Sequence, residues 1–434
     1  MDNTTPRKPN PRRKKVKRIK RIIRTYTPVA IALVLVVLFI IFAAGSVKRA
    51  NAKREEARLE SIAIEESLAK LQYDLGEEAK ELVREAQKLS ASCNYDEAIA
   101  LLDTFSGNPD DFEVLQLARS TFEAEKDALV SVGDVTKIKC LSFANILWDW
   151  TNYTGNSSYN SEDRAYITFE EFQRILQELY DNDYMLVDIY DLFETTVDEN
   201  GNTIIVQKDL RLPSWKKPLM LIATQPTGYD VKFIYDEQYD LLMNEYTNES
   251  LQVLSPAEFV TLLEEFLLKH PDFSYQGSRA VLSLTAHNGL FGYELNQTAE
   301  ITKIAKVLQD KGYILSCNTY GNVSYGNKHK LAEIQEDISS WNVTVAPLIG
   351  QTDILVYAKS SDIEDTKEPY KSDKYELLSD AGFRYYFGVC YNSDPWMSIS
   401  DESIRIGRIM VTYNLLKENP DLYAGLFNAA NILQ

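Results

Sequence analysis

The chain has 434 residues, of which 45% are hydrophobic, and a formal net charge of −18 at pH 7. This length and apolar fraction exclude an intrinsically disordered chain and leave room for two or three folded units. The charge is uneven, because residues 1–24 hold eleven Lys and Arg and one acidic residue, and the rest carries 35 basic and 63 acidic side chains, a net charge of −28. The basic excess therefore belongs to the N-terminal tail.

Residues 25–47 contain no charged side chain, and their core reads PVAIALVLVVLFIIFAAG. As a helix rising about 1.5 Å per residue they would span about 35 Å, enough to cross a bilayer. The positive-inside rule then keeps the tail of residues 1–24 in the cytoplasm and places residues 48–434 outside the cell. A cleaved signal peptide and a basic nucleic-acid-binding patch are alternatives, but Lys48 and Arg49 follow directly and favour an uncleaved anchor. We expect a single-pass membrane protein without a nucleic-acid partner.

Residues 48–132 are predicted to form a helical stalk. Four leucines recur there at spacings of three, four and seven, which is typical of one apolar helix face: Leu68, Leu71, Leu75 and Leu82. The segment NYDEAIALLDTFSGNPDD resembles a single tetratricopeptide-type repeat. One repeat is a weak signal for peptide binding, so a helical spacer and a docking segment for a protein partner both stay open.

From residue 135 onward, short apolar runs alternate with amphipathic helices. Thr168 with Glu171 three residues later predicts a capping box at the start of one helix. VDENGNTIIVQKDLRL predicts a hairpin, and MLVDIYDLF, KPLMLIAT, RAVLSLT, YILSCNT, TVAPLIG and FRYYFGVC predict strands. Alternating β and α elements with near-continuous apolar strands indicate an α/β fold, an irregular or incomplete (β/α) barrel over residues 135–434. In such barrels the chemistry lies at the C-terminal ends of the strands.

Several segments of residues 139–434 resemble the polysaccharide deacetylase family, in particular envelope-associated members from Gram-positive bacteria. They are TFEEFQRILQELYDNDYMLVDIYDL, KPLMLIATQPTGYD, HPDFSYQGSRAVLSLTAHNGLFGYEL, VLQDKGYILSCNTYGN and LLSDAGFRYYFGV. The resemblance implies a metal-dependent hydrolase, in which one Asp is a general base and a second Asp with two His holds a zinc-type metal that activates water.

The residues that the resemblance assigns to this chemistry are changed here. Thr224 and Gln225 stand where the family has its Asp pair, and Asn318 and Asn322 stand where it has its His pair. Carboxamides have no basic nitrogen or charge with which to hold zinc, and neither Thr nor Gln accepts a proton as a carboxylate does. We therefore expect no cofactor, no metal ligands and no catalytic residue at these positions.

Other residues could rebuild the site only in part. The chain has three histidines, of which His287 follows a predicted strand, His270 ends a helix as a capping or packing residue, and His329 lies in a polar loop. His287 and Asp230 are the weak catalytic candidates, and a divalent metal is implied only if they rebuild a site.

The predicted function is a catalytically inactive, membrane-anchored pseudoenzyme that binds cell-wall or capsular polysaccharide outside the cell. Its candidate glycan contacts are Asn318, Asn322, Tyr229 and Tyr320, because amides and aromatic rings suit sugars. One alternative is an active carbohydrate N- or O-deacetylase with non-standard residues. Another is a protein-interaction scaffold that acts through the helical stalk.

Two smaller interpretations concern cysteines and paired acids. The four cysteines form no CxxC motif, and Cys317 with Cys390 could form a disulfide outside the cell or remain two buried thiols. The pair Asp188 and Asp191 is interpreted as solvated surface rather than as a glycosidase pair.

Overall fold

The computed structural model describes residues 77–144, 146–147, 166–224, 231–238, 241–246, 258–326 and 330–434. The predicted membrane span of residues 25–47 lies outside these ranges, as do Gln225, Tyr229, Asp230 and His329. Among the described residues, no helix has the length and hydropathy needed to cross a membrane. The described elements from Glu78 onward belong to one compact unit.

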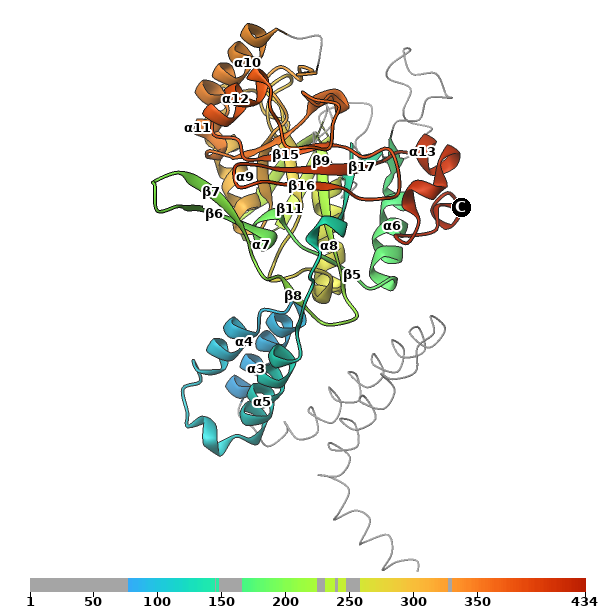
Figure 1. Cartoon of the computed structure of the whole chain (residues 1–434). Coiled ribbons are helices and arrows are strands. Elements are labelled where there is room, and N and C mark those ends of the chain that lie inside the picture. The colour runs from blue at the N-terminus through green and yellow to red at the C-terminus, as the bar shows by residue number, and fades with distance from the viewer. Residues whose placement is uncertain are drawn as a thin grey trace, which may run out of the picture. The chain divides into compact units, whose positions relative to one another are not determined.

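The described chain begins with the helices α3 (Glu77–Ala91), α4 (Tyr95–Leu102) and α5 (Glu113–Asp127), with a short 3-10 turn η2 (Pro109–Asp111) before α5 (Figure 1). Small and apolar side chains are buried between them: Val83, Ala86, Ala98, Leu102, Leu115 and Phe122. The chain leaves this segment through β1 (Val130–Ser131), which pairs antiparallel with β8 (Arg211–Leu212). The helical segment is thus hydrogen-bonded to the domain that follows.

A ring of seven parallel strands forms the centre of that domain in the described part of the chain. Its order is β2 (Lys139–Phe143), β9 (Lys217–Thr224), β12 (Val281–Leu284), β13 (Ile314–Cys317), β14 (Ile354–Val356), β15 (Tyr385–Val389) and β17 (Ile404–Val411), which pairs again with β2. An eighth parallel strand, β5 (Tyr184–Leu186), pairs with the first half of β9. The prediction of a (β/α) barrel is confirmed.

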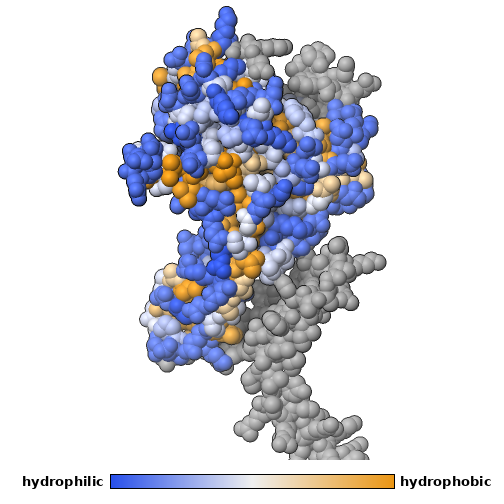
Figure 2. Space-filling view, in the orientation of Figure 1, coloured by the Kyte–Doolittle hydropathy of each residue, from blue (hydrophilic) through white to orange (hydrophobic). Residues whose placement is uncertain are grey.

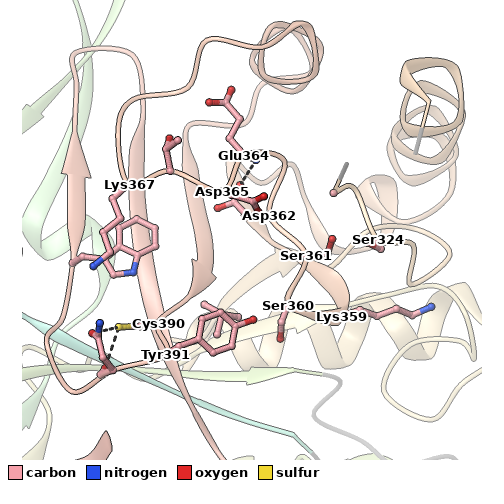
Figure 3. A pocket seen from close by; sticks show the side chains of 15 residues that line it. Ser324, Lys359, Ser360, Ser361, Asp362, Glu364, Asp365, Lys367, Cys390 and Tyr391 are labelled. Carbon is pink, nitrogen blue, oxygen red and sulfur yellow. Dashed lines mark hydrogen bonds between the residues drawn. The ribbon is translucent and has the colours of Figure 1, made fainter. Parts of the chain in front are cut away.

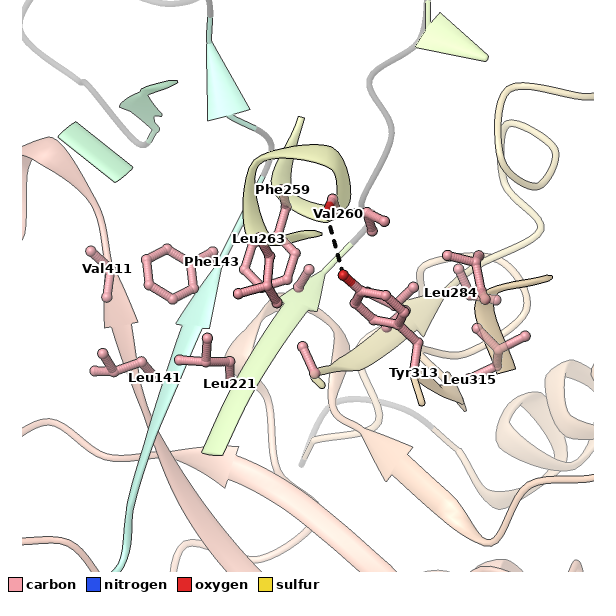
Figure 4. Close-up of a cluster of buried hydrophobic side chains, with 14 of the residues drawn as sticks. Leu141, Phe143, Leu221, Phe259, Val260, Leu263, Leu284, Tyr313, Leu315 and Val411 are labelled. Atoms are coloured by element: carbon pink, nitrogen blue, oxygen red, sulfur yellow. Dashed lines mark hydrogen bonds between the residues drawn. The ribbon is translucent and has the colours of Figure 1, made fainter. Parts of the chain in front are cut away.

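Helices cover the outside of the ring: α6 (Phe169–Asp181), α8 (Phe259–Lys269), α9 (Thr298–Asp310), α10 (Leu331–Thr344), α11 (Ala346–Ile349), α12 (Asp373–Asp380), α13 (Tyr413–Glu418) and α14 (Ala429–Ile432). Figure 4 shows Phe259 and Leu263 of α8 packed over Phe143 and Leu221 of the ring. The predicted capping box is present at α6, where Thr168 and Glu171 each accept the other's main-chain N–H. Since side chains alternate along a strand, the opposite faces of these strands line the barrel interior.

The interior of the barrel carries polar groups. Ser283 of β12 is in register with Ser316 of β13 and with Thr224 of β9, and both serines are fully buried. Arg408 of β17 is 2% exposed and donates from Nη1 to the hydroxyl of Ser142 on β2 at 3.0 Å. The barrel is therefore filled by a polar layer near its C-terminal rim.

Short elements complete the domain: the parallel pair β3 (Ile146–Leu147) and β4 (Ile167–Thr168), the hairpins β6 (Phe193–Val197) with β7 (Thr203–Gln207) and β10 (Val231–Asp236) with β11 (Leu241–Tyr246), and β16 (Met397–Ile399), which pairs antiparallel with β17. The hairpin β6–β7 is the one that the sequence predicts. Figure 2 shows hydrophobic residues gathered beside it on a largely hydrophilic face, and Val197 and Val206 of the hairpin are exposed.

Two strand predictions are wrong in their extent or type. TVAPLIG is not a strand, because residues 346–349 form α11, with Pro347 in its first turn and Gly350 ending it at a φ of 90°. A short apolar run fits a buried helix as well as a buried strand, and Pro in the first helical turn favours the helix. MLVDIYDLF forms only the short strand β5 before α7 (Ile189–Leu192).

The interpretation of Asp188 and Asp191 as solvated surface is wrong, because both side chains are partly buried. The two carboxylates form the capping box of α7, and the hydroxyl of Ser278 donates to Asp191 Oδ2 at 2.7 Å. Burial raises the pKa of both side chains, and that of Asp191 rises to about 6, with the charge of Asp188 as the second cause. A helix N-terminus attracts carboxylates, which explains the position.

All four cysteines are free and buried. Of the two alternatives for Cys317 and Cys390, the structure contains the pair of buried thiols. Cys390 Sγ donates to the main-chain oxygen of Asn392 at 3.2 Å.

Candidate functional site

Two of the predicted site residues sit at strand ends on the C-terminal rim of the barrel. Asn318 follows β13, is 3% exposed, and donates from Nδ2 to the Val356 carbonyl of β14 at 2.9 Å. Thr224 ends β9 and donates from Oγ1 to the Phe143 carbonyl of β2 at 3.0 Å. Each side chain therefore uses a donor to connect two neighbouring strand ends.

The loop after β13 has a constrained backbone. Thr319 has a φ of 63° and Asn322 a φ of 53°, both in the left-handed region. This region is unusual for a β-branched residue, and such outliers persist only where the surroundings hold them. Thr319 Oγ1 accepts the N–H of Val323 at 2.8 Å, which is one of the contacts that hold the loop.

Asp337 of α10 is the second anchor of this loop, and no local pattern in the sequence predicts this role. Its carboxylate is 7% exposed and accepts from the N–H of Tyr320 at 2.7 Å, the N–H of Gly321 at 2.8 Å and the hydroxyl of Tyr325 at 2.6 Å. A buried carboxylate with three donors is well satisfied. Asp337 therefore fixes the loop that carries Asn322.

The histidines are separated. His287 is exposed in the loop after β12, and this loop is joined to the Asn318 loop where the hydroxyl of Thr285 donates to the Tyr320 carbonyl at 2.9 Å. His270 ends α8, and its ring lies 4.6 Å from that of Phe266, as expected of a packing residue. His287 thus lies on a loop bonded to the Asn318 loop, whereas His270 does not.

The described strand-end residues do not fit a zinc-type metal. No group of three or more His, Cys, Asp or Glu side chains that could hold a metal ion occurs in the described ranges. Thr224 and Asn318 are neutral and already donate to main-chain carbonyls. Zinc takes imidazole, thiolate and carboxylate ligands, so these two residues supply no suitable set.

A cavity of about 850 Å³ opens at the C-terminal ends of β13, β14 and β15 (Figure 3). Residues 324–326, 359–367 and 389–396 contribute its lining. This volume is typical of sites for small organic ligands. Thr224, His287, Asn318, Asn322 and Tyr320 are not among the lining residues, so the cavity lies beside the position that the sequence predicts.

One wall of the cavity is built around Arg405 of β17, which is 1% exposed. Its guanidinium donates to Asp362 Oδ2 at 3.2 Å, to the Thr366 carbonyl at 2.7 Å and to the Glu368 carbonyl. It also lies 3.7 Å from the ring centroid of Tyr370. A planar guanidinium with several fixed donors suits this arrangement, and it ties the loop after β14 to the outside of the sheet.

A second wall is the indole of Trp396, which rests on glycines of two adjacent strands. Gly388 of β15 is in register with Gly407 of β17, and a Cβ added to Gly407 would overlap the Trp396 ring. The ammonium of Lys367, which also lines the cavity, lies 5.9 Å from the ring centroid. The absence of side chains at these two glycines therefore allows the indole to pack directly against the strands.

Tyr391 supplies a second aromatic ring and is 79% exposed. In Figure 3 it reaches across the cavity toward Ser360. Lys359 and Ser360, in the opposite segment, have φ values of 53° and 56°, two consecutive left-handed residues. The cavity thus offers two aromatic surfaces among hydroxyl and charged groups.

The sequence contains a signal for this wall. IRIGRIMV carries Arg405 and Arg408 in an otherwise apolar run. Because burying an arginine is costly without partners, arginines in a buried strand indicate an organised polar site nearby. Trp396 lies eight residues before that run.

No family model and no curated protein matches this chain. A search of solved structures finds a deacetylase of Streptococcus pyogenes, PplD, in complex with acetate. The match has 12% sequence identity, covers 70% of this chain and 98% of that one, and has a TM-score of 0.39. These values are too low to assign a family or an activity.

Proposed function

We propose that this protein is a membrane-anchored, extracytoplasmic glycan-binding pseudoenzyme that is related to polysaccharide deacetylases and binds its glycan in the cavity beside the barrel mouth. The main support for this proposal is that two aromatic rings, Trp396 and Tyr391, lie among hydroxyl groups at the C-terminal ends of barrel strands. Sugar rings present apolar faces that pack on aromatic rings and hydroxyls that bond to polar groups. The C-terminal face is also where (β/α) barrels hold their ligands.

In this proposal the barrel does not perform metal-dependent deacetylation. Thr224 and Asn318 stand where the family pattern has an Asp and a His. Their side chains instead donate hydrogen bonds to main-chain carbonyls of neighbouring strands. The competing proposal is an active deacetylase that uses His287 with Asp230. His287 is exposed and lies on a loop bonded to the Asn318 loop, which is the observation in favour of it.

Binding of bacterial cell-wall polysaccharide fragments to the full chain in mild detergent tests the proposal. Trp396→Ala should weaken binding about 10-fold or more, the usual loss when a central aromatic contact is truncated. Trp215→Ala is the matched control, because Trp215 is 54% exposed and does not line the cavity. Equal losses in both variants, or no binding by the parent chain, would contradict the proposal.

Release of acetate from the same fragments separates the two proposals. The pseudoenzyme should release none above the rate without protein. Acetate release that disappears in His287→Ala would support the hydrolase instead.

A further inference from the structure

Three carboxylates line the cavity, and the protein itself engages two of them, Asp362 and Glu364, whereas the third, Asp365, is exposed. Asp362 accepts the hydroxyl of Tyr370 at 2.6 Å and the guanidinium of Arg405 at 3.2 Å. Burial raises the pKa of Asp362, and these two bonds oppose that rise. Glu364 Oε1 accepts the main-chain N–H groups of Lys371 at 3.0 Å and Ser372 at 2.9 Å. A cationic ligand would compete with these bonds.

The lysines of the cavity are less engaged. Lys359 and Lys367 are exposed, and neither forms an ion pair within the described part of the chain. Lys367 instead lies over the ring of Trp396. Ammonium groups on both sides of the cavity are thus available to a ligand.

A third cation lies next to the cavity floor, inside the barrel. Arg408 is in register with Val389, which lines the cavity, and its carbonyl accepts the N–H of Cys390 at 2.8 Å. Its guanidinium donates to the hydroxyl of Ser142 at 3.0 Å and the Tyr357 carbonyl at 2.7 Å.

No carboxylate contacts the Arg408 guanidinium among the described residues, and its Nε has no partner there. Burial lowers the pKa of Arg408 to about 10, so the group stays charged at neutral pH. A buried positive charge is weakly screened, and its field extends into the adjacent cavity.

From these three cations we propose that the group recognised in the cavity is an anion, so that the ligand is a glycan carrying carboxylate or phosphate groups. The proposal rests on the proposed function and specifies its ligand. Trp396 and Tyr391 pack on the sugar ring, and Lys359 and Lys367 contact the anionic substituent. Because the chain beyond the tail has a net charge of −28, that part of the chain on average repels a polyanion, and binding there requires a local group of cations such as the one at the cavity.

The test compares three polymers of similar length with the full chain in mild detergent: polygalacturonate as the carboxylate probe, poly(glycerol phosphate) as the phosphate probe and neutral dextran. At least one anionic polymer should bind at about 50 mM salt and lose most of its affinity near 1 M, where the screening length is about 3 Å. Polygalacturonate carries its charge on sugar rings, whereas poly(glycerol phosphate) carries it on a backbone without rings. Because the basic tail of residues 1–24 also attracts polyanions, binding of either probe supports the inference only where the lysine variant below weakens it.

The double variant Lys359→Gln/Lys367→Gln should weaken anionic binding about 10-fold or more at low salt. Lys88→Gln, an exposed lysine of α3 that does not line the cavity, is the matched control and should bind like the parent. Both replaced lysines are exposed, so the double variant should fold normally.

Different failures have different meanings. Dextran could bind as well as or better than the anionic polymers and lose this binding in Trp396→Ala. That result would contradict the proposal of an anionic ligand but would still support a glycan site in the cavity. Anionic binding that the double variant retains would also overturn the inference, because the charge would be recognised elsewhere. No binding of these polymers or of cell-wall fragments would overturn both proposals.

Discussion

The Arg405→Ala variant removes a guanidinium that lies among four acceptors and the two aromatic rings of Tyr370 and Trp396. The acceptors are Asp362 and the carbonyls of Glu364, Thr366 and Glu368, which all belong to the loop after β14. Removal leaves these carbonyls without their donor and Asp362 without its cation. The loop forms a wall of the cavity, so the variant should lose stability and glycan binding together.

The magnitude follows from burial. Breaking a buried ion pair by removing one partner costs about 3–5 kcal/mol. The side chains of Arg405 and Asp362 are 1% and 16% exposed, and Tyr370 still donates to the carboxylate after the change. We therefore expect a loss at the lower end of this range, about 3 kcal/mol in the free energy of unfolding. With a urea slope of about 3 kcal/mol/M, this loss lowers the unfolding midpoint by about 1 M.

Urea unfolding followed by tryptophan fluorescence measures this shift. Arg405→Lys keeps the charge but not the planar set of donors, so it should recover only part of the loss. Arg84→Ala is the control, since Arg84 is 59% exposed in an ion pair with Glu81 and should change stability by less than about 1 kcal/mol. An Arg405→Ala midpoint equal to that of Arg84→Ala would refute the idea that the guanidinium holds the loop.

Four further outcomes are expected. Folding raises the pKa of Asp191 from 3.8 to about 6, so the protonated carboxyl stabilises the fold fully below pH 3.8, and this stabilisation is lost as the pH rises through 6. The melting temperature of Asp191→Asn should therefore depend less on pH between 3.8 and 6 than that of the parent chain. Gly407→Ala should displace Trp396, change tryptophan emission and weaken glycan binding, whereas unchanged emission would contradict the contact. After unfolding without reductant, mass spectrometry should find four alkylated cysteines, and two would indicate a disulfide. After exposure to Zn²⁺, Co²⁺ and Ni²⁺ and desalting, elemental analysis should find less than about a tenth of an equivalent of metal; near one equivalent, lost in His287→Ala, would revive the hydrolase.

The barrel could be predicted because its strands carry a local signal. KPLMLIAT, AVLSL and YILSC are near-continuous apolar runs, which are typical of strands covered on both faces. The capping box at Thr168 is equally local, because its two partners are three residues apart. Elements whose cause lies within a few residues were therefore predictable.

The cavity could not be predicted, because its cause is not local. Its lining comes from residues 324–326, 359–367 and 389–396, which meet only after the ring has closed. Strand β17 also escaped prediction, since Arg405 and Arg408 interrupt its apolar pattern and find their partners on loops and strands distant in the sequence. Tertiary contacts decide both features.

The indole that rests on Gly388 and Gly407 has a consequence for the kinetics of binding. Its position is determined by the sheet, and Arg405 fixes the opposing loop, so both walls exist before a ligand arrives. A cavity formed in advance needs little ordering of side chains on association. Association should then be limited by diffusion and charge steering rather than by closure of a lid, so that ligands differ mainly in how long they stay bound.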